Sequence, residues 1–309
     1  MGSTKSQAKA LSIIPHVTGT MSLIGSCSIL SDILMSDGQG KLTRPYHRIL
    51  LGISTVDALT SIALALSTLP IPAGTEGVYN ARGNTQTCTV QGFFVQLNVL
   101  SYFYNVILSA YYLLLGKYRM LDAEIARYEK WMHAVAITLG LGFAILGLPL
   151  NLYNNANLWC WVAAYPSNCE DASGEPGPVP CERGQSAWLF RWLIFYGPTW
   201  LAVLAVVAMM VMLTRSVSSD EKEMVRLQIE MRRRSEQEEN GDRPPPIETN
   251  RYERSKLICG QAGFYVIVFL VAIGFASMNR LYQLITGQSS FVLLLGHSIF
   301  GPLQGKVES

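Results

Sequence analysis

The sequence predicts an all-α integral membrane protein, a seven-transmembrane helix bundle with its N-terminus outside and its C-terminus inside. Only 15% of the 309 residues are charged, whereas globular domains carry about 25%. The charges form short clusters between long apolar runs, and the cations gather on alternate loops. A net charge of +2 gives no electrostatic support for nucleic-acid binding.

Seven apolar runs are each close to the ~20 residues that cross a ~30 Å hydrocarbon core as a helix. Their lengths suit helices better than the alternating strands of a membrane barrel. The predicted spans are 11–35, 46–69, 90–116, 131–153, 187–213, 257–279 and 286–305. Residues 1–10 form a short extracellular N-terminus in this scheme, 11–305 form the membrane domain, and 306–309 form a C-terminal stub.

Orientation follows from the Lys and Arg residues, because the loops that face the cytoplasm carry an excess of them. Eighteen cations lie on the side that we assign to the cytoplasm, and Arg191 lies within a span. The opposite side carries only Lys5, Lys9, Arg82, Arg183 and Arg280.

The longest cytoplasmic loop is 214–256, which contains ten basic and ten acidic residues. Its first part continues span five as a helix until the sequence NGDRPPP, and we expect the loop to be partly disordered. It is either a solvated helical extension or a surface that binds a partner.

Four of the six cysteines lie on the outer side, where disulfides form, and they allow three pairings. We favour Cys88 with Cys160 and Cys169 with Cys181, because the second pair would close the sequence SGEPGPVP on itself. Cys27 lies inside a span and is expected to be a small core residue.

Polar groups at membrane depth are costly and usually face the interior of a bundle. Asp57, central in span two, is either a water- or ion-linked switch or a structural hydrogen-bond hub. Asn98 and Asn105 are seven residues apart and therefore share a face of span three. Asn98 is within reach of an outer ligand, and Asn105 either joins helices or acts with Asp57 in the switch. Arg191 pairs with an anionic ligand or extends to the lipid headgroups.

Three prolines, Pro149, Pro198 and Pro302, are expected to kink spans four, five and seven. Each kink requires neighbouring groups to hydrogen-bond the carbonyl that the proline leaves without a donor.

Two other classes of membrane protein stay open as alternatives. A solute transporter is one, although no internal repeat is visible. A zinc-dependent membrane hydrolase, with His16, His297 and Asp57 as ligands, is the less favoured one. No predicted span contains a lysine, so a retinal Schiff base has no attachment point, and we expect no cofactor.

Several motifs in order along the chain resemble one family. They are RPYHRILLGISTVDAL, GNTQTCTVQGFF, YNVILSAYYLLLGKYR, the outer WCW and the terminal FGPLQG. Together they are similar to G-protein-coupled receptors of the cyclic-AMP-receptor-like group, which is related to the secretin-type receptors. The resemblance covers nearly the whole chain from span one to span seven.

The resemblance implies a plasma-membrane receptor that binds an extracellular ligand and couples to a heterotrimeric G protein. It implies a disulfide between Cys88 and Cys160, which precedes Trp161. Outward movement of spans five and six would open the cytoplasmic cleft. The implied G-protein contacts are Arg44, His47, Arg48, Lys117, Tyr118, Arg119, Arg254 and Lys256. The residues expected to bind the ligand are Phe94, Asn98, Trp161, Arg191, Tyr196 and Asn279.

The sequence also departs from better-known receptors. It has no Asp-Arg-Tyr after span three, no Trp-x-Pro in span six and no Asn-Pro-x-x-Tyr in span seven. The rhodopsin-like switch therefore cannot be transferred residue by residue. The ligand stays open between nucleotides, small anions, amines and peptides.

Overall fold

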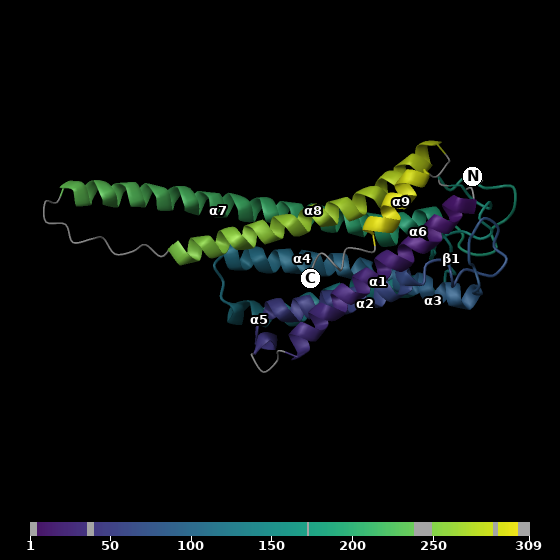
Figure 1. Cartoon of the computed structure of the whole chain (residues 1–309), viewed down its shortest axis with the longest axis horizontal. Coiled ribbons are helices and arrows are strands. Elements are labelled where there is room, and N and C mark those ends of the chain that lie inside the picture. The colour runs from purple at the N-terminus through teal and green to yellow at the C-terminus, as the bar shows by residue number, and fades with distance from the viewer. Residues whose placement is uncertain (1–4, 36–39, 172, 238–248, 287–289, 302–309) are drawn as a thin grey trace.

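The computed structural model describes residues 5–35, 40–171, 173–237, 249–286 and 290–301. Its helices run alongside one another in an elongated bundle, and α7 and α8 project well beyond the others at one end (Figure 1). The helices are α1 (Lys5–Met35), α2 (Pro45–Ala65), α3 (Thr85–Gln96), α4 (Val99–Gly116), α5 (Asp122–Leu146), α6 (Ala187–Arg191), α7 (Gly197–Gln237), α8 (Thr249–Thr286) and α9 (Phe291–Phe300). The remaining elements are a 3₁₀ turn η2 (Lys41–Thr43), a π-helical turn η3 (Trp192–Tyr196) and the strands β1 (Tyr153–Asn155) and β2 (Cys160–Val162).

Contacts between helices close a ring. α1 packs against α2 and α9, α9 against α8, α8 against α7, α7 against α4, and α4 against α2. The main core lies where α2, α4, α5 and α7 meet, and its fully buried members include Ile49, Ile53, Ile125 and Leu213. α4 contributes the most buried side chains to this core, because it is covered on several sides.

Five helical segments of the described chain are long and apolar enough to cross a membrane. They are Lys5–Met35, Pro45–Ala65, Thr85–Gly116, Asp122–Leu146 and Ala187–Met224. The predicted sixth and seventh spans fall on α8 and α9, and α9, at ten residues, is shorter than the ~20 that a crossing needs. The helical continuation of span five is present as far as Gln237, while residues 238–248 and 302–309, which include Pro302, lie outside the described chain.

The third and fourth predicted spans differ from the observed helices. The third is divided into α3 and α4 at Leu97 and Asn98, where the N–H of Asn98 donates to the carbonyl of Val95 at 3.2 Å. α5 begins at Asp122 and ends at Leu146, so Tyr153 belongs to β1 instead of a fourth span. Pro149 does not kink a helix, because it lies in the turns that follow the end of α5.

At Pro198 a neighbouring group hydrogen-bonds the carbonyl that the proline leaves without a donor, as a kink there requires. Pro198 has no N–H to donate to the carbonyl of Ile194, four residues earlier, and the amide Nε2 of Gln96 on α3 donates to that carbonyl instead, at 2.9 Å. The π-helical turn directly before α7 adjusts the backbone at the same place. Cys27, in contrast, is exposed on α1 and is not a core residue.

The two ends of the bundle differ in construction (Figure 1). We call one the hairpin end, because β1 and β2 form an antiparallel pair there in which Asn154 lies opposite Trp161. The other is the arm end, which consists of η2, residues 117–121 and the projecting parts of α7 and α8.

Close crossing of α1 and α2 depends on Gly19. A Cβ atom there would lie 2.7 Å from the backbone nitrogen of Ala65 and 2.9 Å from its Cα, whereas a Cβ at Gly142 would meet nothing within 4 Å. Gly19→Ala is therefore expected to lower the free energy of unfolding by about 1–3 kcal/mol through overpacking. Gly142→Ala, the matched control, should raise it by up to about 1 kcal/mol. Thermal unfolding of the purified protein measures both, and an unchanged midpoint for Gly19→Ala would contradict the crossing.

Candidate functional site

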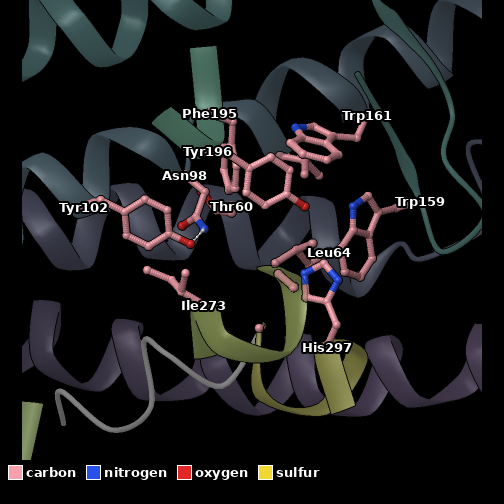
Figure 2. A pocket seen from close by; sticks show the side chains of 13 residues that line it. Thr60, Leu64, Asn98, Tyr102, Trp159, Trp161, Phe195, Tyr196, Ile273 and His297 are labelled. Atoms are coloured by element: carbon pink, nitrogen blue, oxygen red, sulfur yellow. Dashed lines mark hydrogen bonds between the residues drawn. The ribbon is translucent and has the colours of Figure 1, made fainter. Parts of the chain in front are cut away.

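A cavity lies inside the bundle near the hairpin end, with ≈ 50 Å³ of space for the centres of water-sized molecules. A water needs about 10–15 Å³ by this measure, so the space holds more than one water. No acidic side chain and no Lys or Arg is among its lining residues, most of which are apolar or aromatic (Figure 2). They are Thr60, Leu64, Val95, Asn98, Tyr102, Trp159, Trp161, Phe195, Tyr196, Ile273, Ala276, His297 and Gly301.

A few polar groups reach this cavity from different helices (Figure 2). Asn98 Nδ2 donates to the Tyr102 hydroxyl at 3.1 Å across one turn of α4. Thr60 Oγ1 is buried, and no group in the described part of the chain hydrogen-bonds to it. The ring of His297 lies edge-on to Trp159, with 5.3 Å between ring centroids. Apolar walls with a few placed polar groups are typical of small-molecule sites.

Two glutamines of α3 fasten the hairpin over the cavity. Gln91 Oε1 accepts from the N–H of Cys160 at 2.8 Å, and its Nε2 donates to the carbonyls of Ala63 and Ser67 on α2 and the turn after it. Gln96 Oε1 accepts from Trp161 Nε1 at 2.8 Å. Because both amides are buried and hydrogen-bonded, they fix the backbone at Cys160 and the ring of Trp161 against the bundle.

Both disulfides that the sequence favours are formed. Cys88 of α3 is bonded to Cys160 of β2, and Cys169 to Cys181, with Cα–Cα distances of 5.2 Å and 5.0 Å. Within the segment that the disulfide between Cys169 and Cys181 closes, hydrogen bonds from the Ser173 hydroxyl and the Glu175 N–H lower the pKa of Asp171.

Tyr153 anchors the base of the hairpin. Its hydroxyl donates to the carbonyl of Ala144 at 2.6 Å, and burial raises the pKa of the phenol. Its ring requires two glycines beside it, because a Cβ at Gly92 would lie 2.7 Å from Tyr153 Cβ and one at Gly147 2.5 Å from its hydroxyl.

Arg191 contacts the hairpin. Its Nε donates to the carbonyl of Val162 in β2 at 2.6 Å, and the residue is not among those that line the cavity. The side chain is partly buried. Arg183 has a similar contact, because its Nε donates to Asn154 Oδ1 at 2.8 Å.

Half of the expected ligand residues line the cavity: Asn98, Trp161 and Tyr196 do, whereas Phe94, Arg191 and Asn279 do not. Asn279 is buried in α8, and its Oδ1 has no hydrogen-bond partner among the described groups. Sequence reasoning missed Tyr102, Trp159 and His297. The four-residue spacing from Asn98 to Tyr102 could have indicated the first, and the WCW motif the second.

The two expected switch residues lie close to the cavity but do not line it. Asp57 is buried in α2 and interacts electrostatically with Tyr102. Asn105 Nδ2 donates to the carbonyl of Ser101 at 3.0 Å, within its own helix. The break at Leu97 and Asn98 means that the two asparagines do not lie on one regular helix.

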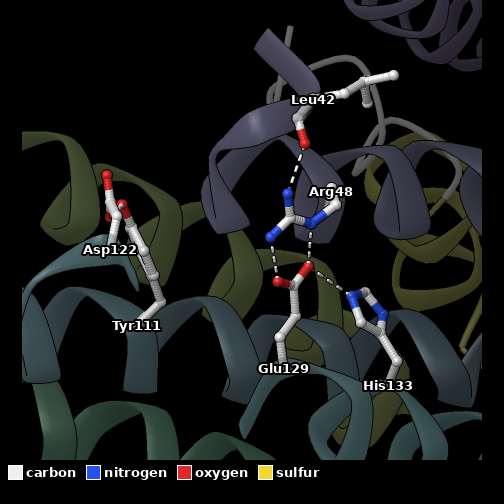
Figure 3. Close-up of polar contacts among 6 residues, drawn as sticks. All are labelled: Leu42, Arg48, Tyr111, Asp122, Glu129 and His133. Atoms are coloured by element: carbon white, nitrogen blue, oxygen red, sulfur yellow. Dashed lines mark hydrogen bonds and ion pairs between the residues drawn. The ribbon is translucent and has the colours of Figure 1, made fainter. Parts of the chain in front are cut away.

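At the arm end, a polar chain joins three helices, and Figure 3 shows the part of it that connects α2 with α5. Arg48 of α2 bonds to Glu129 of α5 through two nitrogens, with Nε to Oε1 at 2.6 Å, and to the carbonyl of Leu42. Glu129 Oε1 lies 3.4 Å from His133 Nε2, and His133 Nδ1 lies 3.0 Å from the Tyr104 hydroxyl of α4. Arg48 is thus engaged inside the bundle in this conformation.

Other residues expected to contact a G protein lie around this chain. Arg44, Lys117 and Tyr118 are exposed, and His47 is partly buried. Arg119 forms an exposed ion pair with Asp220 of α7, with 3.2 Å between nitrogen and oxygen. Arg254 and Lys256 lie in α8, but their side chains are outside the described part of the structure.

His16, His297 and Asp57, which were proposed to bind zinc, do not form a metal site in the described part of the structure. Among the described residues, no group of three or more His, Cys, Asp or Glu side chains is placed to hold a metal ion. His16 Nδ1 bonds to the carbonyl of Ala65, while His297 packs on Trp159 in the cavity.

The structure is a helical membrane bundle with an inner cavity. Comparison with solved structures shows which fold of this class it has. Squid rhodopsin, a G-protein-coupled receptor, matches with a TM-score of 0.67 and 14% sequence identity, over 99% of this chain and 78% of that one. At this identity the match shows the fold alone, so the chain has the fold of a G-protein-coupled receptor. No protein-family model and no curated protein matches it.

A measurement of thermal stability tests whether Gln96 fastens the hairpin. Gln96→Leu leaves the buried Trp161 Nε1–H and the Ile194 carbonyl without a partner, and each loss costs about 1–3 kcal/mol. The thermal midpoint of the purified protein is expected to fall clearly. Gln86→Leu, the same change at an exposed position of α3, should leave it nearly unchanged. Equal midpoints for the two variants would show that Gln96 does not fasten the hairpin.

Proposed function

We propose that this protein is a plasma-membrane G-protein-coupled receptor of the cyclic-AMP-receptor-like group, which binds a small extracellular ligand in the cavity under the hairpin. One observation carries the proposal, namely the cavity, which lies in a receptor fold directly beneath a hairpin tied down by a disulfide and two amides. The motif resemblance and the fold similarity to squid rhodopsin support the same assignment.

The hairpin end is the extracellular end in this proposal. Both disulfides lie there, as expected for an oxidising compartment, and most cations lie in the loops of the opposite side. Seven spans are then completed by α8 and α9, which follow α7 in the ring.

The ligand is proposed to be uncharged and largely apolar or aromatic. A nucleotide or other anion requires cations, and none of Arg82, Arg183, Arg191 and Arg280 lines the cavity. Trp159, Trp161 and Phe195 supply aromatic surface instead, while Thr60, Asn98 and Tyr196 supply hydrogen-bonding groups.

Coupling is proposed to occur at the arm end, by outward movement of α7 and α8 in a population shift. Tyr102 connects the cavity with Asp57 in the bundle interior, and exposed Arg44, Lys117 and Tyr118 present cationic and aromatic contacts to a G protein. The exposed pair between Arg119 and Asp220 joins the turn after α4 to α7, so it opposes this movement.

A ligand screen with uncharged aromatic compounds, read by nucleotide exchange on a panel of reconstituted G proteins, tests the function itself. For an agonist so found, Thr60→Val should lower the potency about 5- to 100-fold, because the unused hydroxyl is lost without breaking a protein hydrogen bond. Thr55→Val, on the exposed face of the same helix, should keep normal potency. Absence of exchange with every G protein and compound would overturn the proposal, and solute accumulation in proteoliposomes would favour the transporter.

Loss of the exposed ion pair is expected to raise signalling without ligand. Asp220→Asn removes a contact worth about 0.2–1 kcal/mol, which corresponds to a rise in basal exchange of about 1.4- to 5-fold. Glu223→Gln is the matched control, since Glu223 lies exposed on the same helix and forms no ion pair within the described chain. Equal basal exchange in both variants would show that the pair does not restrain α7.

A further inference from the structure

A second hollow lies on the outside of the bundle, between α2, α3 and the loop that joins them. Its volume is ≈ 780 Å³, and it shares no lining residue with the inner cavity. The apolar part is lined by Leu59 and Ile62 of α2, by Leu66 directly after that helix, and by Val90 and Phe94 of α3. We call it the α2–α3 groove. Phe94, expected to bind the receptor's ligand, belongs to this groove.

The groove faces the surroundings of the bundle and not its interior. Leu59, Ile62, Leu66 and Val90 are between 39% and 57% exposed, although both helices belong to segments apolar enough to cross a membrane. Their spacing of three or four residues puts each set on one helix face. In a membrane-spanning helix such a face contacts lipid chains, so an acyl chain is the natural occupant of the apolar part.

One end of the groove is cationic. Arg82 lines it together with Gln86 and Thr87, and Arg82 is exposed with no ion-pair partner in the described part of the chain. All the other lining residues are uncharged.

The backbone around Arg82 is held in place. Its N–H donates to the carbonyl of Leu69 at 3.2 Å, and the next N–H, of Gly83, donates to Ile71 at 2.8 Å. Thr87 Oγ1 donates to the carbonyl of Pro70 at 2.9 Å. A Cβ at Gly83 would lie 2.1 Å from the same carbonyl oxygen, so the loop packs against the start of α3 as closely as a glycine allows. The cationic end is therefore preformed.

The N-terminus of α3 adds to the positive potential at this end. α3 begins at Thr85, three residues after Arg82, and its first turn contains no acidic residue. The N-terminus of a helix carries partial positive charge and favours phosphate groups. Arg82 and the helix terminus act on the same region, at the point where the apolar groove ends.

We propose that the α2–α3 groove binds one glycerophospholipid, with an acyl chain along Leu59, Ile62 and Phe94 and the phosphate at Arg82. A free phosphate would use only the cationic end, and an uncharged lipid would use only the apolar part. A glycerophospholipid would use both parts of the groove, because its phosphate adjoins its acyl chains just as the cationic end adjoins the apolar part.

Native mass spectrometry of the full chain in detergent, incubated with phosphatidylglycerol, tests this directly. The expected result is one retained phosphatidylglycerol per chain, with diacylglycerol of the same chains and glycerol phosphate each retained far more weakly. Arg82→Glu should reduce phosphatidylglycerol retention about tenfold or more, because charge attraction becomes repulsion. Lys9→Glu, the same reversal at an exposed position away from the groove, should leave retention unchanged.

The apolar part is tested by filling it. Val90→Trp places a ring in the groove and should reduce retention strongly, while Val135→Trp, at an equally exposed site on α5 (57% and 58% exposed), should not. Ile62→Trp fills the groove from α2 and serves if Val90→Trp fails to fold. Equal retention in the groove and control variants, or equal binding of diacylglycerol, would overturn the proposal.

Discussion

The hydrogen bonds of Gln91 and Gln96 are the contacts on which the hairpin end depends. Both amides come from one helix, α3, and each bonds to two other parts of the chain. Gln91 joins the hairpin to the end of α2, and Gln96 joins it to the turn before α7. The disulfide from Cys88 fixes the hairpin to the same helix. The hairpin, the ring of Trp161 and the turn before α7 thus share one support, which is buried and hydrogen-bonded.

Much of the architecture could be predicted because it depends on local chemistry. Apolar length and cation distribution are properties of short segments, so they indicated a helical membrane bundle, which the structure has. The pairing of the cysteines followed from loop lengths and motifs. The ends of the helices could not be predicted as well. α5 ends at Leu146, and Tyr153 after it packs against Gly92 and Gly147, of which Gly92 is far from it in sequence.

The partners of charged residues were also difficult to predict from the sequence. The family resemblance implied that Arg48 contacts a G protein, and Arg191 was expected to pair with an anionic ligand or to extend to the lipid headgroups. The structure pairs Arg48 with Glu129, 81 residues away, and Arg191 with the carbonyl of Val162, 29 residues away. A cation inside a bundle takes the nearest acceptor in three dimensions. Asn98, Trp161 and Tyr196 line the cavity, and each lies beside a feature that the sequence does show: a helix end, a disulfide or a proline.

The π-helical turn of η3 sets the rotational phase of the long helix that follows it. Each residue of an α-helix advances the side chains by about 100° and the axis by about 1.5 Å. If the same five residues, Trp192–Tyr196, were α-helical, everything after Pro198 would be rotated by about that angle, because a π-helical turn holds about one residue more than an α-helical turn. Asp220 lies about 36 Å farther along this axis than Tyr196, and it would then face away from Arg119. One extra residue beside the cavity therefore determines which face α7 presents at the arm end.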